Sequence, residues 1–210
     1  MRRIFEPIKI GTLELKNRLV MAPMVTQYTH SDGTVSDRLV EYYARRARGG
    51  VGLVIVEMAA VEKGGIAFPN QLRIDEEKYW EGLKILASRI HGEGARAALQ
   101  IHHAGRQSST RASGRRPVAP SPIACPLIGE EPEALSRDGI QALVRRFAEA
   151  AGKTKELGFD AVEVHGAHGY LICQFLSPLS NRRQDEYGGS LQGRSRFGRE
   201  ILRSIRERVG

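Results

Sequence analysis

The chain alternates between short apolar runs and longer segments in which apolar residues recur at helical spacing. The alternation repeats with a period of roughly forty residues, which is typical of consecutive strand–helix units. The apolar runs predict strands at residues 19–24, 52–58, 95–103 and 159–164. The second run offers little polar alternation, so it is typical of a parallel strand that is covered on both faces.

A helix is predicted after each strand, because apolar residues there recur on one face. Serine before such a segment is a favoured N-cap, and glycine is a frequent stop signal. The predicted starts lie near Ser36, Asp75, Ser136 and Gln192. The predicted stops of the first three helices are Gly49–Gly50, Gly92 with Gly94, and Gly158. The residues expected to face the core are Leu39, Val40, Tyr43, Ala44, Ala47, Leu83, Leu86, Ala87, Ile90, Ile140, Leu143, Val144, Phe147, Ala148, Ala151, Phe197, Ile201, Leu202, Ile205 and Val209.

Four strand–helix units make half of an eight-stranded barrel, because parallel strands with right-handed helical crossovers curl in one direction. We therefore predict an α/β protein of the TIM (β/α)8 type with only the first four units present, as one domain over residues 1–210. Its outer strands would present unpaired edges. A doubly wound fold is the competing architecture, but no glycine-rich phosphate fingerprint follows the first strand.

Two segments fall outside this pattern. The residues before the first strand are expected to be irregular. Residues 104–135 are rich in proline and glycine and contain an arginine cluster, so we expect a long insertion without secondary structure. Such an insertion after a strand is more often functional than accidental.

Composition narrows the class of protein. The net charge is +8, but the arginines are interspersed with acids, which argues against a nucleic-acid partner. The two cysteines, Cys125 and Cys173, form no CxxC pair, so neither a disulfide framework nor an iron–sulfur cluster is expected within this chain. The N-terminus has no apolar export segment, and no run reaches membrane-spanning length. We expect a soluble cytoplasmic protein.

The end of the fourth predicted strand carries the densest candidate chemistry, in the segment VHGAHGY. His165, His168 and Tyr170 place two imidazoles and a phenol within six residues, with glycines that allow sharp turns. In a barrel, working residues gather where strands end. Capped or core histidines are the alternative, and HxxH can also supply two metal ligands. No third ligand has sensible spacing, so no metal site is expected.

The other strand ends suggest a flat polar ligand. Gln100 alternates with Ile101 and is a candidate to point into the barrel, where its amide suits the edge of a heteroaromatic ring. Small residues and a proline at Ala22–Met24 would let the backbone approach such a ligand, with the Thr26 hydroxyl as a further donor. Spacing alone supports this ligand and a cluster of neutral acids, but it does not name the reaction.

These segments together resemble the Old Yellow Enzyme family of flavin oxidoreductases, which also includes enoate and 2,4-dienoyl-CoA reductases and amine dehydrogenases. The matching pieces are NRLVMAPM at 17–24, QIHHAGR at 100–106 and EVHGAHGYLICQFLSPLSNRRQDEYGG at 163–189, which continues into GRSRF. The resemblance covers essentially the whole chain, and the last block is highly specific.

The resemblance implies FMN as the cofactor and NAD(P)H as the reductant. The residues that it implies for the FMN ring are Pro23, Met24, Thr26, Ala60 and Gln100. His165 and His168 are implied to bind the carbonyl oxygen of an α,β-unsaturated carbonyl substrate, and Tyr170 to donate the proton. In some branches of the family, Tyr28 is implied to contact the substrate.

The resemblance also implies four further barrel units, which carry the arginine and lysine contacts and the phosphate site of the flavin. We therefore expect poor FMN affinity for this chain alone. The main hypothesis is a reductase of activated alkenes that acts on a small molecule. The alternatives are a non-catalytic half-barrel fragment and a family member that oxidises amines. The open edges predict pairing with the rest of a barrel or with a second copy of the chain.

Overall fold

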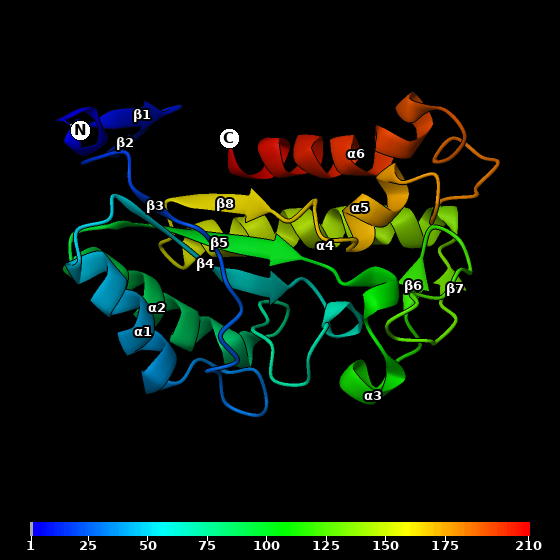
Figure 1. Ribbon diagram of the computed structural model, residues 1–210, viewed down its shortest axis with the longest axis horizontal. Coiled ribbons are helices and arrows are strands. Elements are labelled where there is room, and N and C mark those ends of the chain that lie inside the picture. Colours follow the sequence, from blue (N-terminus) through cyan, green and yellow to red (C-terminus); the bar gives the residue numbers. More distant parts are fainter. Residues whose placement is uncertain (1) are drawn as a thin grey trace.

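The structure is a computed structural model, and it describes residues 2–210. Its centre is a parallel sheet in the order β3 (Val20–Met21), β4 (Leu53–Ala60), β5 (Arg96–His102) and β8 (Ala161–Val164). Each strand is followed by a long helix: α1 (Asp37–Arg48), α2 (Trp80–Gly92), α4 (Arg137–Glu156) and α6 (Leu191–Val209). Figure 1 shows these four units in succession. The prediction of four β/α units of a TIM-type barrel is confirmed.

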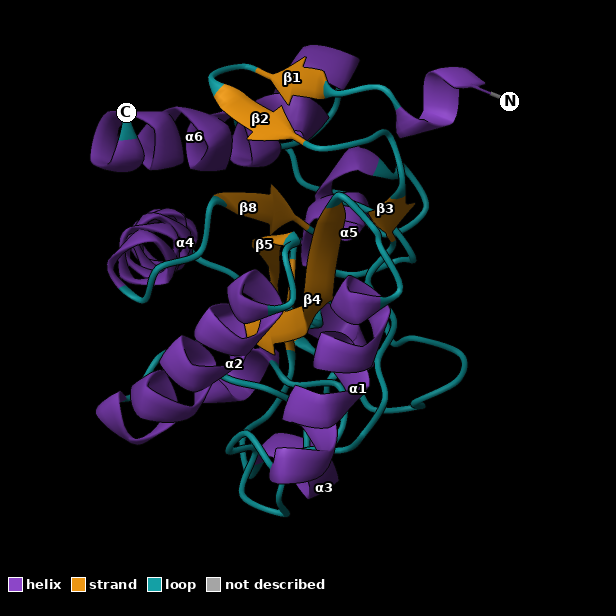
Figure 2. Cartoon of the chain, turned by 90° about the vertical axis from the view of Figure 1, so that its left-hand side faces the viewer, coloured by secondary structure: helices purple, strands orange, loops and turns teal. Residues whose placement is uncertain are grey.

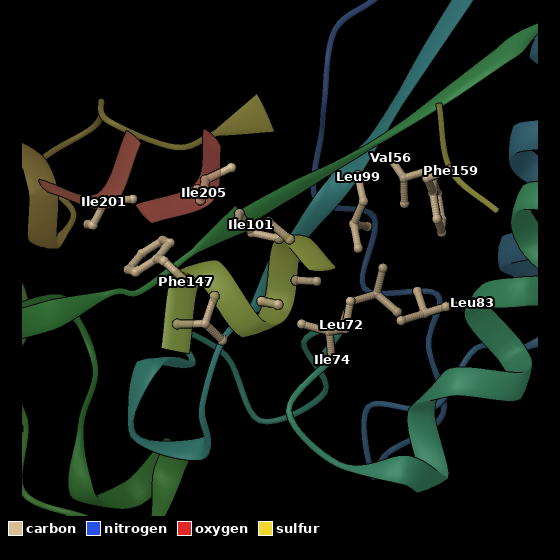
Figure 3. Packing of buried hydrophobic residues seen from close by; sticks show 14 of the residues in the cluster. Val56, Leu72, Ile74, Leu83, Leu99, Ile101, Phe147, Phe159, Ile201 and Ile205 are labelled. Carbon is tan, nitrogen blue, oxygen red and sulfur yellow. The ribbon is translucent and has the colours of Figure 1, made fainter. Parts of the chain in front are cut away.

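The pleat of the strands separates the core from the inside of the barrel. Alternate residues such as Val54, Leu99 and Ile101 are buried against the helices. In Figure 2, α1, α2 and α4 lie along one side of the curved sheet. Figure 3 shows how the strand residues meet Leu83, Phe147 and other side chains of the main core. Burial of each such side chain stabilises the folded state by roughly 1.5–3 kcal/mol relative to leaving it exposed to water.

The segment before the first sheet strand is ordered, so the prediction of an irregular start was wrong. It contains a short 3₁₀ helix, η1 (Arg2–Phe5), and an antiparallel hairpin of β1 (Ile8–Ile10) and β2 (Leu13–Leu15). Leu15 is fully buried and forms a second small core with Leu53 and Ala98, which lie on the inward face of the sheet. The hairpin therefore covers the inside of the sheet near the start of its strands.

The first predicted strand is shorter than expected, since β3 ends at Met21 and not at residue 24. Pairing between β3 and β4 involves only Val20 and Met21. Further on, the Thr26 backbone N–H donates to the Glu57 carboxylate at 3.1 Å instead of joining the sheet. A side-chain acceptor thus replaces the strand partner and turns this segment into a loop.

The helix starts follow local capping chemistry. Ser36, Ser136 and Ser190 each accept a hydrogen bond from the backbone three residues later, as N-caps do. The second helix begins at Trp80 rather than near Asp75, after the 3₁₀ turn η3 (Glu77–Tyr79).

The insertion after β5 is folded, contrary to the expectation of a structureless segment. It contains η4 (Gly105–Gln107), α3 (Thr110–Ser113), β6 (Val118–Ala119) and β7 (Glu133–Ala134), and the last two pair in parallel. Arginine side chains hold it: Arg106 donates to the carbonyls of residues 123 and 124, and Arg183 donates to those of residues 120 and 135.

Two further short helices, η2 (Lys63–Gly65) and α5 (Leu171–Leu176), were not predicted. Among the described residues, no helix is long and apolar enough to cross a membrane.

One core assignment was wrong. Leu202 on α6 is 57% exposed, whereas its neighbour Ile201 is fully buried. Ile201 belongs to the main core, which α6 joins by packing against α4 and α5. A helix advances by 100° per residue, so adjacent positions at the border of an apolar face can have opposite environments.

Matched truncations on α6 test this orientation. Ile201→Ala is expected to lower the free energy of unfolding by about 2–5 kcal/mol, because it removes buried methyl groups and leaves a cavity. Leu202→Ala is expected to change it by no more than about 0.5 kcal/mol. Urea unfolding followed by circular dichroism measures both, and equal losses in the two variants would contradict the observed orientation.

Candidate active site

A cleft of about 570 Å³ lies at the carboxyl ends of the sheet strands. In barrels this is the end at which ligands bind. One wall comes from the loop after β3, and the other comes from β8 and the loop that follows it. The lining residues are Ala22, Pro23, Met24, Val25, Met58, Gln100, Glu163, Val164, His165, Gly166, Ala167, His168 and Tyr170.

Six of the predicted site residues meet in this cleft: Pro23, Met24, Gln100, His165, His168 and Tyr170. The chain brings them together from three separate strand ends. They create one surface that is apolar on the Pro23 side and carries hydrogen-bonding groups on the side of the imidazoles.

Three predicted residues do not line the cleft. The Thr26 hydroxyl donates to Glu57 Oε2 at 2.7 Å. The Ala60 backbone N–H donates to a carbonyl of the chain, that of Leu72, at 2.9 Å. The Tyr28 ring packs edge-on against Tyr42, and the guanidinium of Arg38 lies 3.7 Å from the centroid of the Tyr28 ring. The hydrogen-bond donors expected from Thr26 and Ala60 are therefore already used within the chain.

The two cleft histidines form a chain of hydrogen bonds. The Ala167 N–H donates to His165 Nδ1 at 3.2 Å, so the proton of a neutral His165 resides on Nε2. That nitrogen lies 3.2 Å from His168 Nδ1. His165 Nε2–H can then donate to His168 Nδ1, which leaves the Nε2–H of His168 as the outer donor. Burial lowers the pKa of His165, and nearby His168 lowers it further, so the neutral form is favoured.

Tyr170 stands beside this pair. Its ring lies 4.9 Å from that of His165 in an edge-to-face arrangement, with an interplanar angle of 87°. Burial raises the pKa of the Tyr170 phenol above its ordinary value of 10.0. The phenol therefore keeps its proton at neutral pH and is available as an acid.

His102 is a further imidazole at the site that the sequence did not single out. It is fully buried, and its ring lies 4.9 Å from that of Tyr170. Its Nε2 contacts the side-chain nitrogen of Gln71, whose oxygen accepts from the Ala67 N–H at 2.8 Å, so Nε2 acts as an acceptor. Nδ1 then carries the proton and has no partner among the described residues. Burial holds the pKa of His102 well below 6.5. Its place two residues after Gln100 was the available signal.

Glu163 was also missed. It pairs in register with Gln100, and the Gln100 Nε2–H donates to Glu163 Oε1 at 2.6 Å. The bond fixes the orientation of the amide, because only the nitrogen end can donate. The place of Glu163 two residues before His165, which directly follows the strand, was the available signal.

Glu57, a buried acid in β4, binds the loop after β3, which forms the cleft wall opposite the histidines. Its Oε2 accepts from the Thr26 N–H at 3.1 Å, the Thr26 hydroxyl at 2.7 Å and the Tyr43 hydroxyl at 3.2 Å. The Tyr43 oxygen in turn accepts from the Glu57 N–H at 2.8 Å. Burial raises the pKa of Glu57, while the hydrogen bonds from Thr26 and Tyr43 oppose the rise. A single acid within an apolar strand was the sequence signal for this anchor.

Fold and site together define four β/α units of an α/β barrel, with a cleft at the carboxyl ends of the strands. Residues 3–210 match the model of the NADH:flavin oxidoreductase / NADH oxidase family, and the chain belongs to this family. The resemblance to the Old Yellow Enzyme group is thereby confirmed, as are FMN as the family's cofactor and NAD(P)H as its reductant. Among residues 2–210, no group of three or more potential ligands is placed to hold a metal ion.

Three similar proteins illustrate the relationship. The chain is 48% identical over 209 residues to the NADH oxidase of Thermoanaerobacter brockii, across 99% of this chain and 32% of that protein. A 2-naphthoyl-CoA reductase in complex with 2-naphthoyl-CoA matches with a TM-score of 0.95 at 35% identity, over 100% of this chain and 34% of that one. Morphinone reductase in complex with tetrahydroNAD matches with a TM-score of 0.93 at 33% identity, over 99% and 61%. The chain thus spans only part of the length of each.

The pH dependence of stability tests the buried Glu57. Because burial raises its pKa above 4.5, the carboxyl stabilises the fold at low pH, and this contribution is lost as pH rises through the folded-state pKa. Glu57→Gln keeps an acceptor oxygen for Thr26 and Tyr43 but carries no charge. We expect the variant to gain stability relative to the unsubstituted chain as pH rises above about 4.5. Urea unfolding between pH 4 and 8 measures the difference, with the exposed Glu133→Gln as control, and a difference independent of pH would contradict the assignment.

Proposed function

We propose that this chain is the N-terminal half of an FMN-binding barrel, and that the whole barrel reduces the C=C bond of α,β-unsaturated carbonyl compounds with electrons from NAD(P)H. The observation that carries the proposal is the meeting of His165, His168 and Tyr170 in one cleft with Gln100. All four side chains can donate a hydrogen bond while they are neutral. Such a set suits a substrate whose oxygen gains negative charge during the reaction.

The cleft residues fit a flavin ring. One N–H of the Gln100 amide is used by Glu163, so a second N–H and the carbonyl oxygen remain. A donor and an acceptor on one amide suit the imide edge of a pyrimidine ring. Pro23 and Met24 supply an apolar wall for a flat ring system. Thr26 would contribute only if its hydroxyl turned away from Glu57, and Ala60 only if its N–H left its present carbonyl partner.

When bound, FMN would supply the hydride that it has taken from NAD(P)H. The two histidines would bind the substrate carbonyl oxygen. His168 offers its outer N–H, and an oxygen placed between the rings would compete for the N–H of His165. Neutral donors aimed at a developing negative charge stabilise the transition state without a preceding change of protonation.

Tyr170 would complete the reduction by protonating the α-carbon. Its raised pKa keeps the proton in place until a carbanion-like carbon develops. The names of two relatives, a 2-naphthoyl-CoA reductase and a morphinone reductase, support reduction rather than amine oxidation. Tyr28 packs outside the cleft, so a substrate contact there would require the loop after β3 to move.

The direct test of this function measures flavin binding and turnover. The protein is mixed with FMN and desalted, its flavin absorbance is recorded, and NADH or NADPH oxidation is followed with an enone or an amine added. We expect flavin retention in the complete barrel and nicotinamide oxidation that depends on the enone. A colourless protein without turnover would favour the non-catalytic fragment, and electron transfer from amines to the flavin would favour the amine-oxidising class.

The role of Tyr170 is separable by half-reaction. In the complete barrel, Tyr170→Phe is expected to slow enone reduction by about 10²- to 10⁴-fold, since it removes a positioned general acid. Reduction of the flavin by nicotinamide should keep its rate, because that step needs no proton from the phenol. Stopped-flow absorbance separates the two steps, with Tyr42→Phe as control. Equal loss of both half-reactions would remove Tyr170 from this role.

A further inference from the structure

The loop that carries the second histidine has an unusual backbone. His168 has φ +55° and Gly169 has φ +73°, so two consecutive residues adopt the left-handed region. Glycine enters this region freely, but histidine does so at a cost, because its Cβ crowds the following carbonyl. His168 therefore holds this conformation only if its surroundings favour it.

Two glutamines bind the carbonyls of these residues. Gln107 Nε2 donates to the His168 carbonyl at 2.7 Å, and Gln174 Nε2 donates to the Gly169 carbonyl at 2.7 Å. Gln107 belongs to η4, after β5, and Gln174 belongs to α5, after β8. The turned backbone thus lies between donors from two different elements.

Gln174 has no freedom to turn. Its second N–H donates to the Ala104 carbonyl at 2.9 Å, and its Oε1 accepts from the Arg106 N–H at 3.1 Å. The side chain is 1% exposed, and a Cβ on Gly105 would lie 2.2 Å from Oε1. Gly105 itself has φ +59°, so glycine is required there for both conformation and space. The buried amide therefore joins the loop after β5 to the loop after β8 in one orientation.

Gln107 approaches from the more exposed side of the loop. A Cβ on Gly169 would lie 2.8 Å from its Nε2, so a side chain there would displace it. The His168 backbone that Gln107 holds carries the ring whose Nδ1 faces His165 Nε2 at 3.2 Å. The direction of the outer N–H of His168 depends on this backbone.

We propose that Gln107 and Gln174 are positioning residues for His168: they hold its backbone in the left-handed conformation and so aim its imidazole into the cleft. The role of that imidazole rests on the proposed function, but the positioning itself does not. Neither glutamine lines the cleft, so both would act through the histidine.

The test uses Gln107→Met and Gln174→Met, which keep the side-chain length and remove the donors. The readout is the ring ¹⁵N and ¹H signals of His165 and His168 in the labelled, cofactor-free protein, with His168→Asn used for assignment. We expect both variants to shift the signals of His165 Nε2 and His168 Nδ1. The exposed Gln184→Met is the matched control and should leave them unchanged.

Unchanged imidazole signals in Gln107→Met would overturn the proposal, as would the same shift in Gln184→Met. Gln107 is half-buried and uses one side-chain bond, so its variant remains decisive even if Gln174→Met fails to fold. In flavin-loaded enzyme, Gln107→Met should slow enone reduction about ten- to a hundredfold and leave flavin reduction unchanged. Absence of enone turnover in the unsubstituted enzyme would reject the proposed function but would leave the imidazole comparison intact.

Discussion

The pairing of β5 with β4 on one side and β8 on the other is the constraint on which both core and site depend. In this strand Leu99 and Ile101 face the helices, so Gln100 and His102 must face the inside of the barrel. The register with β8 then places Gln100 opposite Glu163. A shift by one residue would exchange the two sets and would bury the amide and the imidazole among the helices.

Burial around this inward face favours neutral side chains. The pKa of His165 is lowered and that of Tyr170 is raised, and in both groups loss of solvation is the leading cause. The same physical effect therefore stabilises the uncharged form of a base and of an acid. His165 and Tyr170 thus present donors without fixed positive charge, which suits an oxygen that becomes negative only as the reaction proceeds.

Much of the fold could be predicted from periodicity, because apolar spacing reports burial directly. The four strand–helix units followed from it, whereas the β1–β2 hairpin did not, since each of its strands has only three residues. The site was predicted in part. His165, His168 and Tyr170 share a short segment, but Glu57 binds Thr26 and Gln174 binds Ala104, and each of these contacts joins segments far apart in the chain. A lone acid in an apolar strand marks Glu57 as unusual, but no local pattern identifies the distant residues that Glu57 and Gln174 bind. The prediction that Leu202 faces the core was wrong for a related reason, because its exposure depends on which helices lie beside α6.

The two walls of the cleft are held by different chemistry, with different consequences. The loop after β3 is held by hydrogen bonds to the carboxyl of Glu57. The charge of this group changes with pH, and its burial is costly. The loop after β8 is held by hydrogen bonds from the side-chain amides of Gln107 and Gln174, which do not titrate. A change of pH should therefore alter the contacts that hold the Pro23–Met24 wall more than those that hold the backbone of the histidine wall. A ligand between the walls would contact one surface whose anchor responds to protonation and another whose anchors do not. This asymmetry follows from the identity of three anchoring side chains, and it does not require any difference in the strands that present them.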